Sequence, residues 1–83
     1  MMLKILYYMK NLLEAGEKRY FTIAGFDKKI ALKVKRRLLE LGFTRGQKIK
    51  IINKSLLKRT YLIELRSVLL TLRYDILKYI LVE

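Results

Sequence analysis

The side chains that could do chemistry in this sequence are carboxylates and cations, because it contains no His and no Cys. Nucleophile–base catalysis through Cys or His is therefore excluded, as are zinc fingers and most iron or copper sites. The remaining acidic ligands are scattered along the chain and outnumbered by cations: Glu14, Glu17, Asp27, Glu40, Glu64, Asp75 and Glu83. The sequence accordingly predicts no enzyme, no metal site and no cofactor.

Positive charge is concentrated in the middle of the chain. The 83 residues carry 19 Lys and Arg against 7 Asp and Glu, a formal net charge of +12. Between residues 28 and 59, twelve basic residues face one acidic residue, Glu40, so this segment alone holds +11. Such a segment favours an anionic partner, and charge alone leaves nucleic acid, a membrane surface, an acidic protein face and a merely solvated surface all open.

The rest of the composition predicts one small domain with an aliphatic core, since 53% of the residues are hydrophobic. No apolar run reaches the roughly 18 residues that a membrane-spanning helix needs. The first eight residues hold a single Lys and no small-residue cleavage site, which argues against a signal peptide. We expect a cytoplasmic protein.

Two helices are expected in the first half of the chain. Residues 3–14 place apolar side chains at helical spacing, and Gly16 ends that segment. Asp27 is positioned to cap a second helix that runs to Leu41 and closes at Gly42. Its core-facing stripe comprises Ile30, Ala31, Val34, Leu38 and Leu41.

The remaining elements are short strands, predicted from alternating apolar residues at 18–23, 48–53, 60–65, 68–72 and 79–82. A single helical turn is expected over residues 74–78. Short strands in a small chain commonly curl up so that their edges are hidden. The predicted fold class is therefore mainly β with helices (α+β), a small β-barrel.

Three segments resemble the ferrous iron transport protein A (FeoA) family. Residues 36–46, RRLLELGFTRG, are similar to its Arg-Leu-x-x-Leu-Gly signature with a following Gly. Residues 70–73 and 80–83 resemble its closing pattern, and Leu13-x-x-Gly16-Glu17 resembles its opening one. The resemblance spans about residues 12–83, which leaves 1–11 as an N-terminal helical extension of a single domain over 1–83.

The resemblance implies an SH3-like barrel with one crossing helix. It also implies a non-enzymatic accessory protein of bacterial ferrous iron uptake, which binds the cytosolic side of a membrane GTPase permease. The chain departs from the family pattern in the 54–59 loop, which has neither Pro nor Gly, and at Ser67, where Gly is expected.

Partner contact is expected on one face of the second helix, formed by Lys33, Arg36, Arg37 and Leu39. The adjacent leucines Leu56 and Leu57, at a hairpin tip, favour a contact site or a homo-oligomer. Structural roles are expected for four residues: Leu38 and Leu41 in the core, and Gly42 and Gly46 at backbone angles that side chains oppose.

Three alternatives stay open. The basic segment, with Tyr20, Phe43 and Tyr61 stacking on bases, fits a nucleic-acid-binding small barrel. The resemblance equally fits a FeoA-like regulatory module of transcription control. An apolar N-terminal helix beside the basic segment fits a protein that is peripheral at the inner face of a membrane.

Overall fold

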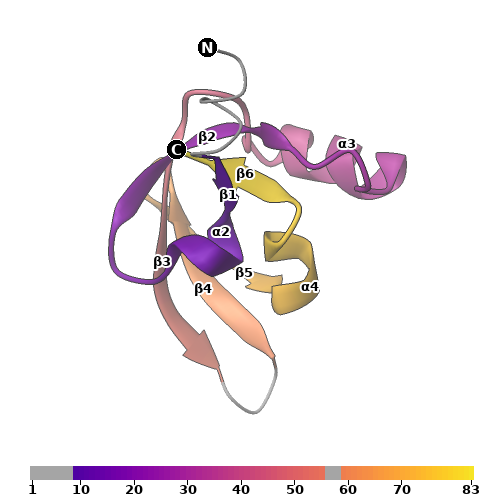
Figure 1. Cartoon of the computed structure of the whole chain (residues 1–83). Coiled ribbons are helices and arrows are strands. Elements are labelled where there is room, and N and C mark those ends of the chain that lie inside the picture. The colour runs from indigo at the N-terminus through magenta and orange to yellow at the C-terminus, as the bar shows by residue number, and fades with distance from the viewer. Residues whose placement is uncertain (1–8, 56–58) are drawn as a thin grey trace.

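The computed structural model describes residues 9–55 and 59–83, which form one sheet with short helices beside it (Figure 1). The elements of these ranges follow in chain order: β1 (Lys10–Asn11), α2 (Leu12–Ala15), β2 (Tyr20–Phe26), α3 (Leu32–Glu40), β3 (Lys48–Ser55), β4 (Thr60–Leu65), β5 (Val68–Arg73), α4 (Tyr74–Leu77) and β6 (Ile80–Val82). None of the helices among these elements has the length and apolar character required to cross a bilayer.

The sheet has six strands in the order β1-β6-β2-β3-β4-β5, with each neighbouring pair antiparallel. Over the described residues β1 and β5 are its two edges, so the sheet is open and the expected closed barrel is wrong. Closure fails because β1 offers only two residues, both paired with β6, while β5 runs directly into α4. The mainly β character of the prediction is confirmed.

The N-terminal helix is only partly as predicted. Residues 1–8 lie outside the described ranges, and Lys10 and Asn11 pair with β6 instead of continuing a helix. The helix begins at Leu12 because Asn11 caps it: its side chain accepts from the Glu14 N–H at 2.8 Å. In return the Glu14 carboxylate accepts from the Asn11 N–H at 3.2 Å, which completes a capping box. The predicted end at Gly16 is confirmed, since this residue has a φ of 99°.

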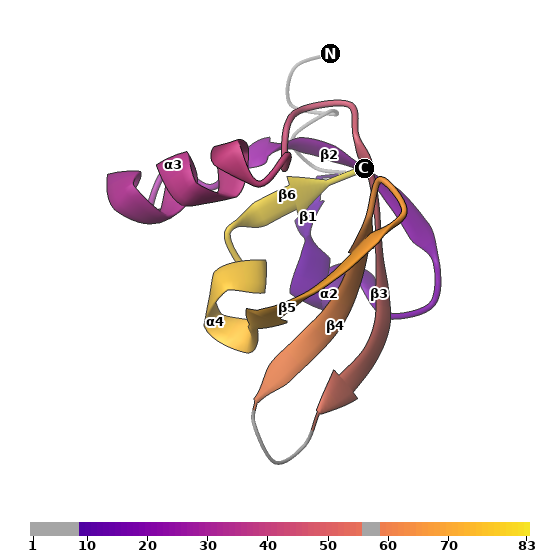
Figure 2. The same cartoon turned by 180° about the vertical axis from the view of Figure 1, so that it is seen from behind.

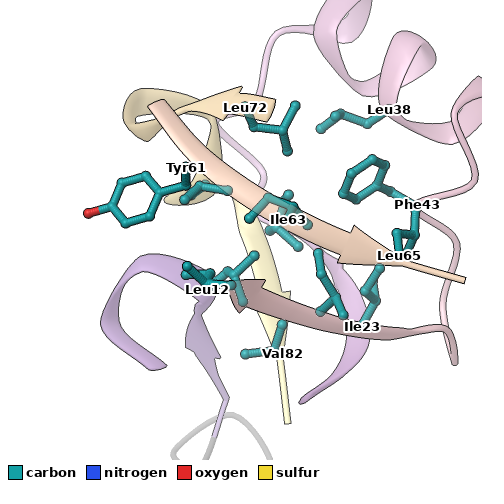
Figure 3. Close-up of a cluster of buried hydrophobic side chains, with 13 residues drawn as sticks. Leu12, Ile23, Leu38, Phe43, Tyr61, Ile63, Leu65, Leu72 and Val82 are labelled. Carbon is teal, nitrogen blue, oxygen red and sulfur yellow. The ribbon is translucent and has the colours of Figure 1, made fainter. Parts of the chain in front are cut away.

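The core lies between the curled sheet and the helices, where Leu12, Phe43 and Ile63 are among the fully buried side chains (Figure 3). Strand β4 shows how the sequence determines which side chains enter this core. Its residues alternate between buried and half-buried, with Tyr61, Ile63 and Leu65 on the buried face. This period of two follows from the pleat of a strand.

Two turns shape the sheet around β4 and β2. Arg66 and Ser67 join β4 to β5 with positive φ angles of 54° and 65°, the conformation of a type I′ two-residue hairpin. Ser67 therefore occupies a position at which Gly would be unstrained. In β2 the pairing with β6 shifts between Ile23 and Gly25, which forms a β-bulge.

Candidate partner-binding surface

Helix α3 projects from one end of the sheet, as both views of the molecule show (Figures 1 and 2). Leu38 is the buried residue of this helix, at 2% exposure, and Val34 is half-buried. The other seven side chains of α3 are exposed. A nine-residue helix held by so few apolar contacts leaves most of its surface to solvent or to a partner.

The predicted start of this helix at Asp27 is wrong. The Asp27 carboxylate accepts from the Lys29 N–H at 2.9 Å, and its carbonyl accepts from the Ile30 N–H at 3.1 Å, so it closes a turn. The helix begins after Ala31, which serves as N-cap without a side-chain hydrogen bond. Ile30 and Ala31 therefore precede the helix and are not part of its stripe.

The end of the helix places Leu41 outside the core, contrary to prediction. Leu38 is buried as expected, but Leu41 is 48% exposed. The interior position is taken by Phe43, which is fully buried and whose N–H donates to the Leu38 carbonyl at 3.0 Å. Gly42 allows this reversal with a φ of 105°, a region that side chains rarely adopt.

The loop after the helix is tied to β2 at its bulge. The Gly46 N–H donates to the Ile23 carbonyl at 2.8 Å, and Gly46 has a φ of 92°. Arg45 donates from Nε to the Ala24 carbonyl at 2.9 Å in a half-buried site. Arg45 therefore holds the loop in place, a role that its basic character alone does not indicate.

The predicted contact residues on α3 are all accessible. Lys33, Arg36 and Arg37 are exposed, and Leu39 beside them is exposed as well. No ion pair joins these cations to a carboxylate within residues 9–55 and 59–83, where the salt bridge found links Arg73 to Asp75. Glu40 is exposed on the same side of the helix, four residues after Arg36, but forms no ion pair with these cations, so the face is basic overall and partly apolar. The other predicted contacts, Leu56 and Leu57, lie outside the described residues.

Sequence reasoning missed a groove that runs between α3 and β5. One hollow of about 400 Å³ is lined by Lys33, Val34, Arg37, Leu38, Leu41, Thr71, Leu72 and Ile76. A second hollow, of about 270 Å³, is lined by Leu41, Leu65, Arg66, Val68 and Leu70. Leu41 belongs to both, so the side chain expected in the core stands in the middle of this groove. Finding it required the sheet order, which no local sequence pattern supplies.

The aromatic residues considered for base stacking do not share a surface. Tyr20 is exposed, whereas Phe43 is fully buried and Tyr61 is largely buried (Figure 3). Carboxylates do not cluster either: within the described parts of the chain no three acidic residues gather as a metal-binding group. The features that remain for recognition are cations, exposed leucines and the groove.

Comparison with known proteins identifies relatives of the chain. The family model of the FeoA domain matches residues 10–83 of this sequence. The structure of a FeoA-like protein from Clostridium acetobutylicum is similar at 31% identity and a TM-score of 0.78, over 90% of this chain and 85% of that one. The structure of FeoA from Chlorobium tepidum is similar at 26% identity and a TM-score of 0.77, over 88% of this chain and 68% of that one.

A more distant structure has the same fold. FeoA from Stenotrophomonas maltophilia, an SH3 domain protein, is 22% identical with a TM-score of 0.65, over 77% of this chain and 78% of that one. No curated protein matches the chain by sequence. The fold described above, although open at its edges, is thus the SH3-like fold of these proteins.

Proposed function

The chain belongs to the FeoA family, and from this premise we propose that it is a non-enzymatic accessory protein of ferrous iron transport that binds the cytosolic part of the membrane iron permease. The Stenotrophomonas maltophilia relative is described as a candidate ferrous iron transport activating factor. A protein that activates a transporter must contact it or something bound to it. The proposal therefore needs a recognition surface and no reaction centre.

The observation that carries the proposal is the basic and apolar face of α3. Arg36 and Arg37 are exposed and have no carboxylate partner among the described residues, while Leu39 adds exposed apolar area beside them. Cations favour an acidic partner face and raise the rate of encounter, and a central apolar side chain contributes to affinity once water is excluded.

The proposal is tested by capture of the purified cytosolic domain of the permease with the double variant Arg36→Glu/Arg37→Glu. We expect at least a tenfold loss of affinity with the melting temperature nearly unchanged, because both side chains are solvated in the free protein. Lys18→Glu/Arg19→Glu is the matched control: it makes the same charge change at two exposed residues far along the chain from α3. Full retention of capture by the α3 variant contradicts the assignment of this face, and no capture by the unmodified chain contradicts the proposed function.

Nucleic acid is the second candidate, favoured by the +11 held between residues 28 and 59. Titration with single-stranded RNA and duplex DNA at 50 and 200 mM salt separates the two candidates. Phosphate contacts predict saturable binding that weakens steeply with salt. Such binding, together with no capture of the permease domain, favours this second function.

A further inference from the structure

Strand β5 is an edge of the sheet without the usual protection. An exposed strand edge presents unpaired N–H and C=O groups, which proteins commonly block with charges, Pro or bulges. Val68–Arg73 reads VLLTLR, with a charge only at its end and no bulge in its pairing with β4. Val68 and Leu69 are each 60% exposed. Among residues 9–55 and 59–83 no strand pairs with this edge, so it is open to pairing with another strand.

The hydrogen-bonding groups that face outward follow from the hairpin. In a two-residue hairpin the pair that closes the turn, here Leu65 and Val68, exchanges hydrogen bonds, and such pairs alternate with non-bonded ones. The main-chain groups of Leu69, Thr71 and Arg73 therefore point away from β4. Leu69 and Thr71 each offer an N–H and a C=O, whereas Arg73 offers its N–H alone, because its carbonyl accepts within α4 as the N-cap of that helix. These groups are enough to bind a short strand.

The groove defined above lies along this same edge. Thr71 and Leu72 project to opposite faces of β5, yet both line the larger hollow of the groove. This hollow therefore follows the edge of the strand and is not confined to one face of the sheet. Its other wall is α3, and Leu38 and Leu72 point toward one another between the two elements (Figure 3). A strand added to β5 would place alternate side chains against this apolar wall.

Charge selects the occupant of the groove. Lys33, Arg37 and Arg66 line the two hollows, and no carboxylate does. A second copy of the chain would bring the same cations and its own net charge of +12 to the contact, which opposes self-pairing. An acidic segment instead gains from each of these cations.

We propose that the groove between α3 and the free edge of β5 binds an extended segment of a partner protein, with apolar residues at alternate positions and Asp or Glu between them, by strand addition to β5. This deepens the proposed function, on which it rests for the partner. The basic face of α3 then guides encounter, while main-chain pairing along β5 supplies register and affinity.

The experiment titrates the ¹⁵N-labelled full chain with a synthetic eight-residue peptide that alternates Val with Glu and Asp. We expect saturable shifts at residues 68–73 and slower hydrogen exchange at the Leu69, Thr71 and Arg73 amides. A Lys-for-Glu and Lys-for-Asp version of the peptide should bind at least tenfold more weakly. Failure of the acidic peptide to perturb β5, or equal binding of the basic one, overturns the inference.

Two variants test the mode of binding. Thr71→Pro removes an outward N–H at an edge position where Pro is compatible with a sheet, and it should weaken the acidic peptide at least tenfold. Arg66→Glu reverses a groove charge on the β4–β5 turn without touching the main chain, and it should weaken the peptide severalfold even if Thr71→Pro fails to fold. Unchanged affinity in Arg66→Glu, or a doubled mass of the free protein that Thr71→Pro abolishes, overturns the inference.

Permease capture separates this inference from the proposed function. If Arg36→Glu/Arg37→Glu loses the permease domain while Thr71→Pro and Arg66→Glu retain it, the function holds and strand addition is wrong. If the unmodified chain fails to capture the permease domain but the acidic peptide still pairs with β5, the groove is a strand-binding site and the permease proposal is wrong.

Discussion

The Tyr20 hydroxyl on β2 donates a 2.6 Å hydrogen bond to the Glu64 carboxylate on β4, across the intervening strand β3. Lys50 of β3 is the register partner of both residues, and its Nζ lies 4.8 Å from the centre of the Tyr20 ring. One aromatic ring, one cation and one carboxylate therefore connect three strands on the outer face of the sheet.

This contact predicts a titration. The hydrogen bond donated to Glu64 raises the pKa of Tyr20 above 10.0, with smaller contributions from desolvation and from the Glu64 charge. Because the folded-state pKa is the higher one, the stabilisation is fully present below pH 10 and is lost as the pH rises through the raised value. Tyrosinate absorbance, assigned by comparison with Tyr20→Phe, should show this group ionising earlier in Glu64→Ala. Glu17→Ala, which removes an exposed carboxylate elsewhere, should leave the curve unchanged.

Leu38 and Leu41 should respond very differently to truncation. Leu38→Ala removes a buried side chain that anchors α3 and should cost about 2–5 kcal/mol of unfolding free energy. Leu41→Ala removes a half-exposed side chain and should cost only about 0.5 kcal/mol. Urea denaturation measures both values, and equal costs would contradict the placement of Leu41 in the groove.

The β4–β5 turn offers a stabilising substitution. Ser67 has a φ of 65°, which disfavours L side chains but not glycine. Ser67→Gly should therefore raise the unfolding free energy by about 0.5–1 kcal/mol, despite the greater freedom that glycine has in the unfolded chain. Ser67→Ala keeps a Cβ and should give no gain in the same thermal melts. A destabilised Ser67→Gly protein would argue against the type I′ geometry.

Helix α3 should open more readily than the sheet. Few of its side chains are buried, whereas β4 lies between two strands and contributes Ile63 at 0% exposure to the core. Amide hydrogen exchange should therefore be much faster over α3 than over β4, with the α3 rates independent of global stability. Equal protection of the α3 and β4 amides from exchange would contradict this expectation. So would exchange rates of both elements that change together at low denaturant concentrations.

Sequence reasoning succeeds where a local pattern determines the structure. The alternation in residues 60–65 corresponds to β4 at both ends, and the predicted turn at residues 74–78 corresponds to α4 within one residue. The predicted close of the second helix at Gly42 is also correct, because the positive φ of this glycine ends the helix locally. In each case neighbours in sequence make the interactions that fix the element.

Sequence reasoning fails where contacts between segments far apart in the chain determine the structure. Strand β1 has only two residues, too few to show a periodicity in the sequence, and it is a strand because it pairs with β6. Leu41 satisfies the helical stripe, but Phe43 fills the interior position that it would need. The accessible edge of β5 likewise follows from the order of strands, so the groove was not predictable from β5 or α3 alone.

The place of β6 in the sheet has a consequence for synthesis on the ribosome. Residues 80–82 lie between β1 and β2, and Thr22 exchanges two main-chain hydrogen bonds with Glu83 at 2.9 and 3.0 Å. The segments translated first therefore lack the strand that joins them until nearly all of residues 9–83 have been made. The β3–β4–β5 meander joins neighbouring segments and does not need β6, whereas β1 and β2 enter the complete sheet only after β6 is available.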